Sequence, residues 1–229
     1  SIPKDKTRQN YLFKKRLLSN VPIHFISPSK WVFDKIKTIN LNKQSTVQVI
    51  PNAVDTGLFK PGNKLKARTD LSLPPDGVII LSSAIGLMRN PYKDFQTLSD
   101  AFELVSDTNN INGNIYLIIL GDKEENCLID FKNIIFQDII YETTILQKYY
   151  QASDIYVHSS NVETWGLTIT EALNSGLPVI ASNVGAIPEQ ISGYQYESHN
   201  NNLKLNNHRN NNANGLLFER GDSSMLAEQ

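Results

Sequence analysis

Residues 154–173 read DIYVHSSNVETWGLTITEAL, a short apolar run followed by a polar loop and a segment with helical character. The run at Ile155–His158 is typical of a buried strand. Two carboxylates, Glu163 and Glu171, bracket the start of the helix. The first amides of a helix lack intrahelical partners and attract anions, while carboxylates accept hydrogen bonds from hydroxyl groups. The stretch therefore predicts a site for a ligand with both phosphate and hydroxyls, such as a nucleotide sugar.

The rest of the chain repeats this order of strand and helix. Apolar runs predict strands at 22–26, 47–50, 77–82, 114–120, 134–136 and 178–181, and apolar residues at helical spacing predict helices at 30–39, 95–105, 144–152 and 167–174. Strands that are apolar throughout are typical of a parallel sheet covered on both faces. We therefore expect an α/β fold with a Rossmann-like parallel sheet flanked by helices.

The bulk composition excludes several classes of protein. The chain has 229 residues, 40% of them hydrophobic, and a formal net charge of −1, so its charge predicts no nucleic-acid partner. The single cysteine, Cys127, cannot form an internal disulfide, and no apolar run approaches the length of a spanning helix. A signal-peptide pattern is also missing from the first residues, so we expect a cytoplasmic protein.

Two segments depart from the alternation. Residues 4–18 mix basic and apolar types, which suits either a helix on an anionic membrane surface or a helix with a solvated basic face. Residues 192–214 are rich in asparagine and predict an exposed insertion. His199 and His208 lie in it, but no cysteine or cluster of carboxylates accompanies them in the sequence, so we expect no bound metal. A polar linker is expected near 40–45, and the ends of the chain suggest a piece of a longer protein.

Two loops carry the candidate site residues. Ligands of open parallel sheets bind beyond the carboxyl ends of the strands. The loop after the strand at 77–82 holds Arg89 and Lys93, which can neutralise phosphates or can be ordinary surface cations. The loop after Ile155–His158 leads to amides that can bind phosphate, at Trp165, Gly166, Leu167 and Thr168. Its two glutamates can bind sugar hydroxyls or can serve only as capping groups.

The chain resembles the C-terminal, donor-binding domain of glycosyltransferase family 4, whose enzymes have the two-domain GT-B fold. Five segments in the family's order carry the resemblance: IPNAVDTGLFKP at 50–61, NPYKDF at 90–95, the Glu163…Glu171 pair within 152–178, VGAIPE at 184–189 and NGLLF at 214–218. Ala53 and Asp94 stand where the family usually has glycine. The resemblance implies that residues 1–44 are the tail of an N-terminal acceptor domain and linker, and that residues 45–229 form the donor domain with the insertion at 192–214.

The resemblance also implies residue roles and a reaction. Glu171 is expected on the donor ribose, Glu163 on the transferred sugar, and Lys93, Arg89 and the amides at 166–168 on the diphosphate. The enzyme would be a metal-independent, retaining glycosyltransferase without a cofactor, using a nucleotide-diphosphate sugar and an unknown glycan or lipid acceptor in polysaccharide biosynthesis. It would be cytoplasmic, with peripheral contact with the inner face of a membrane as an option. The alternatives are a non-catalytic nucleotide- or sugar-phosphate-binding module and a structural domain of the same fold.

Overall fold

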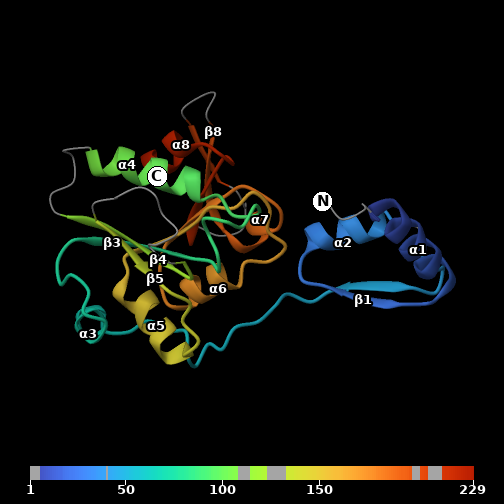
Figure 1. Ribbon diagram of the computed structural model, residues 1–229, viewed down its shortest axis with the longest axis horizontal. Coiled ribbons are helices and arrows are strands. Elements are labelled where there is room, and N and C mark those ends of the chain that lie inside the picture. Colours follow the sequence, from blue (N-terminus) through green and yellow to red (C-terminus); the bar gives the residue numbers. More distant parts are fainter. Residues whose placement is uncertain (1–5, 40, 108–113, 123–132, 198–201, 206–212) are drawn as a thin grey trace. The chain divides into compact units, whose positions relative to one another are not determined.

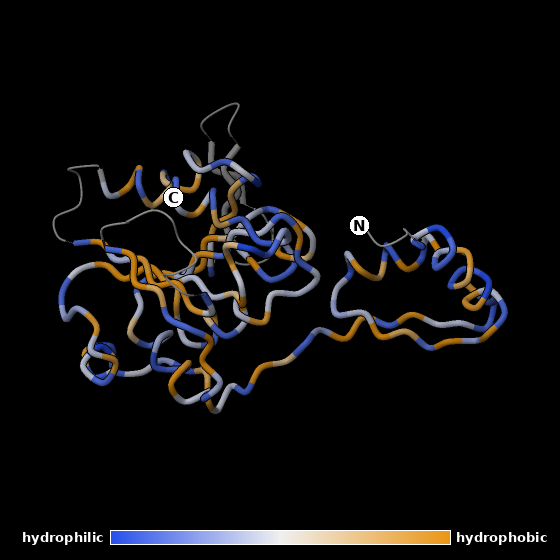
Figure 2. Tube along the Cα trace, viewed as in Figure 1, coloured by the Kyte–Doolittle hydropathy of each residue, from blue (hydrophilic) through white to orange (hydrophobic). Residues whose placement is uncertain are grey.

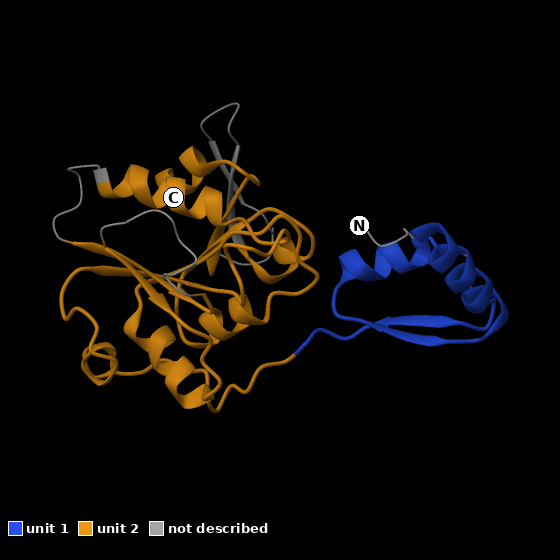
Figure 3. Ribbon diagram, viewed as in Figure 1, with its two compact units in different colours: residues 1–52 blue, residues 53–229 orange. Residues whose placement is uncertain are grey.

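A computed structural model of the chain describes residues 6–39, 41–107, 114–122, 133–197, 202–205 and 213–229 (Figure 1). The chain divides into two compact units, residues 1–52 and residues 53–229 (Figure 3). The sequence predicts a boundary between residues 44 and 45, with a polar linker near 40–45. The structure corrects this boundary, because the strand that follows the expected linker pairs inside unit 1. Residues 50–61 therefore straddle the division.

Unit 1 contains α1 (Thr7–Asn20), β1 (His24–Ser27), α2 (Lys30–Lys37) and β2 (Thr46–Val49). β1 and β2 are parallel, with α2 as their crossover. The Oγ of Ser29 accepts a hydrogen bond from the amide of Val32 at 3.2 Å and caps α2, as its position in the sequence predicts. No residue of α1 is buried. In the part of the chain that the structure describes, no helix has both the length and the apolar character needed to cross a bilayer.

Unit 2 is built on an eight-stranded sheet in the order β5-β4-β3-β6-β7-β10-β8-β9. The strands are β3 (Val78–Ser83), β4 (Ile115–Leu120), β5 (Ile134–Gln137), β6 (Ile155–His158), β7 (Val179–Ser182), β8 (Gly193–Glu197), β9 (Asn202–Leu205) and β10 (Gly215–Phe218). All neighbouring pairs are parallel except β8 and β9. The predicted fold class, a mainly parallel Rossmann-like sheet flanked by helices, is confirmed.

Helices cover both faces of this sheet, and the strands at its centre are largely apolar (Figures 1 and 2). The helices are α3 (Lys64–Asp70), α4 (Phe95–Asp107), α5 (Thr143–Ala152), α6 (Leu167–Asn174), α7 (Ile187–Gln190) and α8 (Ser223–Glu228). Alternate residues of β4 belong to different cores: Ile118 packs in the cluster with α5 and α6, and Leu117 in the cluster with α4 and α8. Burial on both faces explains why periodicity of two is missing from these strands.

One prediction about the last third of the chain needs correction, and one helix elsewhere was not predicted. Part of the expected insertion at 192–214 forms the antiparallel strands β8 and β9, whose residues alternate between polar types and Tyr or Leu as strand residues do. Residues 198–201 and 206–212, with His199 and His208, lie outside the described residues. The family segment at 214–218 contains strand β10, and the segment at 184–189 runs into helix α7. α3 was not predicted from the sequence.

Candidate functional site

The candidate site lies where β3 and β6 end side by side. These strands are parallel neighbours, and the chain continues outward from them in opposite directions, from β3 to β4 and β5 and from β6 to β7, so they form the topological switch point of the sheet. Ligands of such sheets bind at this point. The two following loops are joined by backbone hydrogen bonds: the amide of Asp94 donates to Ser159 at 3.3 Å, and the amide of Asn161 donates to Tyr92 at 2.9 Å. The structure thus brings the two loops with candidate residues together, as predicted.

Lys93 and Glu163 form an ion pair between these loops. The distance from Lys93 Nζ to Glu163 Oε2 is 2.8 Å, and each side chain is only 16% exposed. The other carboxylate oxygen, Oε1, accepts the amides of Thr164 at 3.0 Å and Trp165 at 3.4 Å. Burial by itself raises the pKa of Glu163, but hydrogen bonds with His158 and Lys93 outweigh it and hold that pKa well below its usual range. Glu163 is therefore ionised at neutral pH.

His158 joins this ion pair from the end of β6. Its Nε2 lies 3.0 Å from Ser160 Oγ, 3.4 Å from Lys93 Nζ and 3.5 Å from Glu163 Oε2. Its Nδ1 lies 3.4 Å from the hydroxyls of Tyr156 and Thr168. Burial lowers the pKa of His158, so the ring is uncharged at neutral pH. The structure therefore places His158 beside both charged groups of the site.

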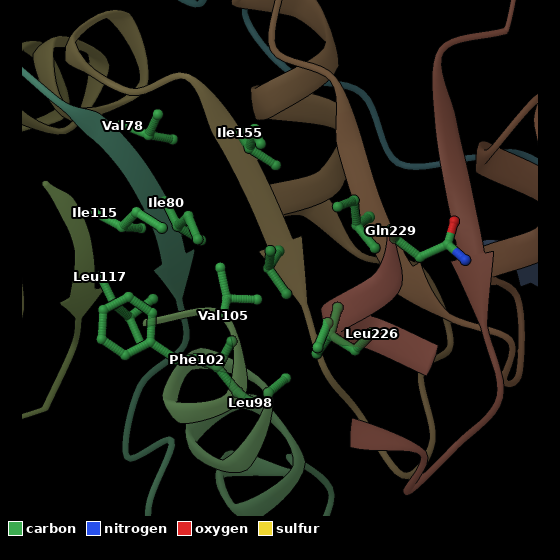
Figure 4. A pocket seen from close by; sticks show the side chains of 14 residues that line it. Val78, Ile80, Leu98, Phe102, Val105, Ile115, Leu117, Ile155, Leu226 and Gln229 are labelled. Atoms are coloured by element: carbon green, nitrogen blue, oxygen red, sulfur yellow. The ribbon is translucent and has the colours of Figure 1, made fainter. Parts of the chain in front are cut away.

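An open hollow of about 380 Å³ adjoins the pair and is lined by Tyr92, Lys93, Val162, Glu163 and Thr164. A second cavity, of about 210 Å³, lies between the sheet and helices α4 and α8 (Figure 4). Figure 4 shows it lined by apolar side chains such as Val78, Phe102 and Leu226, with Gln229 at one side. Its lining is apolar apart from Gln229, so of these two hollows the first suits a charged, hydroxylated ligand better.

Glu171 belongs to a second network, on α6. Its Oε2 accepts a hydrogen bond from the hydroxyl of Tyr150 at 2.7 Å. Burial raises the pKa of Glu171, while the hydrogen bond from Tyr150 opposes that rise. The two glutamates of the stretch therefore have different partners: Glu163 meets a cation, and Glu171 meets a neutral donor.

The amides at the start of α6 are only partly as expected. The amide of Gly166 donates to Oε1 of Gln190 at 2.9 Å, and the Nε2 of Gln190 donates back to the Gly166 carbonyl at 2.9 Å. The amide of Gly166 is thus paired with α7 in this structure, and its contact with phosphate stays a prediction. A Cβ at Gly166 would lie 2.9 Å from Ile169 Cδ1, which gives the glycine a packing role. The amides of Leu167 and Thr168 remain predictions.

The other predicted residues surround this centre. The Nε1 of Trp165 is buried and has no hydrogen-bond partner among the described residues. Arg89 is exposed in the turn after β3, where its amide donates to the Gly86 carbonyl at 3.0 Å, and its contact with phosphate stays a prediction. Asp94 does not contact the ion pair with its carboxylate, which instead accepts the amide and hydroxyl of Thr97 at 3.2 and 2.7 Å and caps α4.

Sequence reasoning missed three supports of the site: Tyr150, Gln190 and Gly185. Gly185 has a φ of +57°, and a Cβ on it would overlap the carbonyl oxygen of Glu163. The amide of Ala186 donates to that same oxygen at 2.9 Å. A glycine just after a predicted strand indicates a turn with positive φ, so the turn at Gly185 could be predicted. Its partner, Glu163, lies 22 residues earlier in the sequence, and no local pattern reveals that contact.

The chain is similar to a known family and to solved structures. Residues 81–229 match the family described as "Glycosyl transferases group 1". D-inositol 3-phosphate glycosyltransferase from Segniliparus rotundus is 27% identical over 167 residues, which are 66% of this chain and 36% of that protein. Protein CapJ from Staphylococcus aureus is 28% identical over 115 residues, 47% of this chain and 29% of that protein. The chain spans about a third of the length of the curated relatives it matches.

Solved structures share the fold. Sucrose-phosphate synthase from Thermosynechococcus elongatus superimposes with a TM-score of 0.70 at 23% identity, over 100% of this chain and 53% of that one. HepE from Anabaena, solved in complex with UDP and glucose, superimposes with a TM-score of 0.69 at 20% identity, over 97% of this chain and 56% of that one. At these identities the likeness supports the arrangement of strands and helices and nothing finer.

Proposed function

Because this chain belongs to the group 1 glycosyltransferases, we propose that unit 2 is the donor-binding half of a retaining enzyme that moves a sugar from a nucleotide-diphosphate sugar to an acceptor. The observation that carries the proposal is the Lys93–Glu163 ion pair at the switch point of the sheet. It places a buried cation and an ionised carboxylate beside an open hollow. A structural ion pair would not need such a hollow.

In the proposed reaction the donor diphosphate lies against Lys93 and the amides of Leu167 and Thr168. The bond between sugar and phosphate breaks through an oxocarbenium-like state, and negative charge grows on the leaving diphosphate. Lys93, these amides and Arg89 stabilise that charge without a metal ion or a cofactor. Losing one preorganised donor of this kind typically costs about 10²–10³ in rate. Glu163 contacts the transferred sugar, and Glu171 contacts the ribose.

The nucleotide and the acceptor belong to the proposal as well. Uridine diphosphate is the first candidate, because HepE was solved with UDP and with UDP-glucose. The acceptor is a glycan, a lipid or another hydroxyl compound, in polysaccharide biosynthesis for instance. We place its site in an N-terminal domain to which unit 1 belongs. A cytoplasmic location, with peripheral membrane contact through the basic helix α1, is part of the same proposal.

Isothermal titration of the 229-residue chain with UDP, GDP, ADP and their glucose conjugates tests the proposal. We expect at least one nucleoside diphosphate to bind, and Lys93→Gln to weaken it at least tenfold. The matched control is Lys66→Gln, which removes a lysine paired with Asp70 on α3. Absence of binding by the wild type would overturn the donor site. A longer parent protein that binds donor but transfers sugar to no acceptor would instead indicate a non-catalytic module.

A further inference from the structure

Tyr150 contacts Glu171, the residue predicted to bind the ribose, although its own helix, α5, carries no predicted site residue. It lies on α5, its side chain is fully buried, and its hydroxyl donates to Glu171 Oε2 at 2.7 Å. Burial raises the pKa of Tyr150 well above 10, so the phenol keeps its proton at every working pH. Glu171 therefore has a permanent hydrogen-bond donor on one of its two oxygens.

The position of this hydroxyl is set by packing. The ring of Tyr150 meets that of Phe59 edge to face, with centroids 5.7 Å apart and an angle of 84°. On another side it packs against Tyr156, with centroids 5.8 Å apart. Both neighbours are buried. A ring held in this way cannot change rotamer without opening the core, so the hydroxyl fixes the carboxylate rather than following it.

A carboxylate that binds a diol needs a fixed orientation. Its two oxygens together offer about four acceptor sites, and two neighbouring hydroxyls can use two of them. A glutamate on a helix surface rotates freely about its last torsion, which is broad and roughly two-fold. A donor on Oε2 removes that freedom and leaves acceptor sites for a ligand. It also favours the charged form of Glu171, which accepts hydrogen bonds without donating one.

We propose that Tyr150 is a positioning residue, which holds the Glu171 carboxylate in the orientation that accepts hydrogen bonds from two neighbouring ribose hydroxyls of the donor nucleotide. The inference rests on the proposed function and adds a determinant of ribose recognition to it. Tyr150 does not touch the ligand. It acts through Glu171, and the part of the ligand that it influences is confined to the diol.

The test compares ligands with and without the diol. The 229-residue chain is titrated with UDP and with 2′,3′-dideoxy-UDP, and the corresponding GDP and ADP pairs are measured in parallel. Hydrogen bonds to a charged group support a wild-type preference of about 10–100-fold for the ribose form. In Tyr150→Phe this preference falls to about threefold or less, while affinity for the dideoxy form stays within twofold. A general loss of structure would weaken both ligands alike.

Tyr149→Phe is the matched control. Tyr149 is the adjacent residue of α5, is also buried, and donates its hydroxyl to Gln137 Oε1 at 3.1 Å. This variant keeps the wild-type ribose preference. In a Glu171→Gln background, Tyr150→Phe has no further effect on the preference. Phe59→Leu, which loosens the ring and keeps the hydroxyl, gives an intermediate preference and serves if Tyr150→Phe does not fold.

The outcomes separate the two proposals. If the wild type binds no nucleoside diphosphate, the donor site itself is wrong and the inference is overturned with it. If the wild type binds and prefers the ribose form, but Tyr150→Phe or Phe59→Leu keeps that preference in full, only the role of Tyr150 is wrong. Equal weakening of the ribose and dideoxy forms would likewise overturn it, because that result indicates a purely structural tyrosine.

Discussion

Replacing Gly185 by alanine tests how the Glu163 loop is held. Gly185 follows β7 and has a φ of +57°. A Cβ there would overlap the carbonyl oxygen of Glu163 and lie 3.0 Å from the carbonyl carbon and the amide nitrogen of the same residue. All three atoms belong to the backbone, so no side chain can swing away to make room. The loop that carries Glu163 has to move.

The expected cost has two parts. The left-handed conformation costs a non-glycine residue about 1–2 kcal/mol. Overpacking against a rigid neighbour adds about 1–3 kcal/mol, so Gly185→Ala should lower the free energy of unfolding by about 2–5 kcal/mol. Gly86 and Gly221 also have positive φ, of +64° and +78°, but nothing lies within 4 Å of a Cβ on either. Alanine at these two positions should cost only the conformational part.

Urea unfolding at pH 7 measures these differences. The chain has two tryptophans, Trp31 in unit 1 and Trp165 beside the site, so a Trp31→Phe background makes Trp165 the only reporter. In that background Gly185→Ala should lose about 1–3 kcal/mol more than the two control variants. The reasoning is refuted if the three alanine variants are equally stable.

Three further predictions concern the charged groups. Lys93→Met leaves the partly buried Glu163 carboxylate without its hydrogen-bonding cation and should cost about 1–3 kcal/mol at pH 7, measured by urea unfolding. Because the pKa of Glu163 is lowered in the folded chain, this cost should shrink as the pH falls below about 4.5, and a constant cost would contradict the ion pair. His158 has a lowered pKa, so the unfolded chain binds a proton that the folded chain does not. Stability present above about pH 6.5 should then fall by up to about 1.4 kcal/mol per pH unit on acidification, and His158→Asn should flatten that slope, with His24→Asn as the control. Asp94→Ala should destabilise by about 1 kcal/mol through loss of the α4 cap, while Asp94→Asn keeps most of it; equal losses in thermal unfolding would exclude a capping role.

The fold was largely predictable because its signals are local. Each central strand is a continuous apolar run, and the helix stripes repeat every three or four residues, so order and type follow from short windows of sequence. Lys93 and Glu163 were predictable as neighbours, since each follows a strand and parallel strands bring such loops to one edge. β8 and β9 were missed because their short alternating runs lie within a segment dominated by asparagine.

The missed supports of the site depend on contacts between distant segments. Tyr149 and Tyr150 are adjacent in the sequence, yet one donates to Gln137 and the other to Glu171. Only the rotation of α5 about its axis decides which hydroxyl meets which partner, and the sequence leaves that rotation open. Gln190 is similar, because its two hydrogen bonds to Gly166 require α7 to lie against the start of α6.

The contrast between Glu163 and Glu171 bears on how the site would work. The pKa of one is lowered and that of the other is raised, and groups whose surroundings push their pKa values apart often divide the roles in a site. In the structure Glu163 neutralises Lys93, the cation that the proposal assigns to the donor phosphates. A diphosphate that binds Lys93 competes with Glu163, so its arrival would release a carboxylate oxygen beside the sugar. Glu171 pairs with no cation among the residues that the structure describes, so it would keep its neutral donor, Tyr150, and its preference for neutral hydroxyls. Glu163→Gln should therefore strengthen the binding of a free nucleoside diphosphate while weakening sugar transfer. Glu171→Gln should weaken both, because it loses the contact with the ribose. A loss of nucleoside diphosphate affinity in Glu163→Gln would argue against this competition.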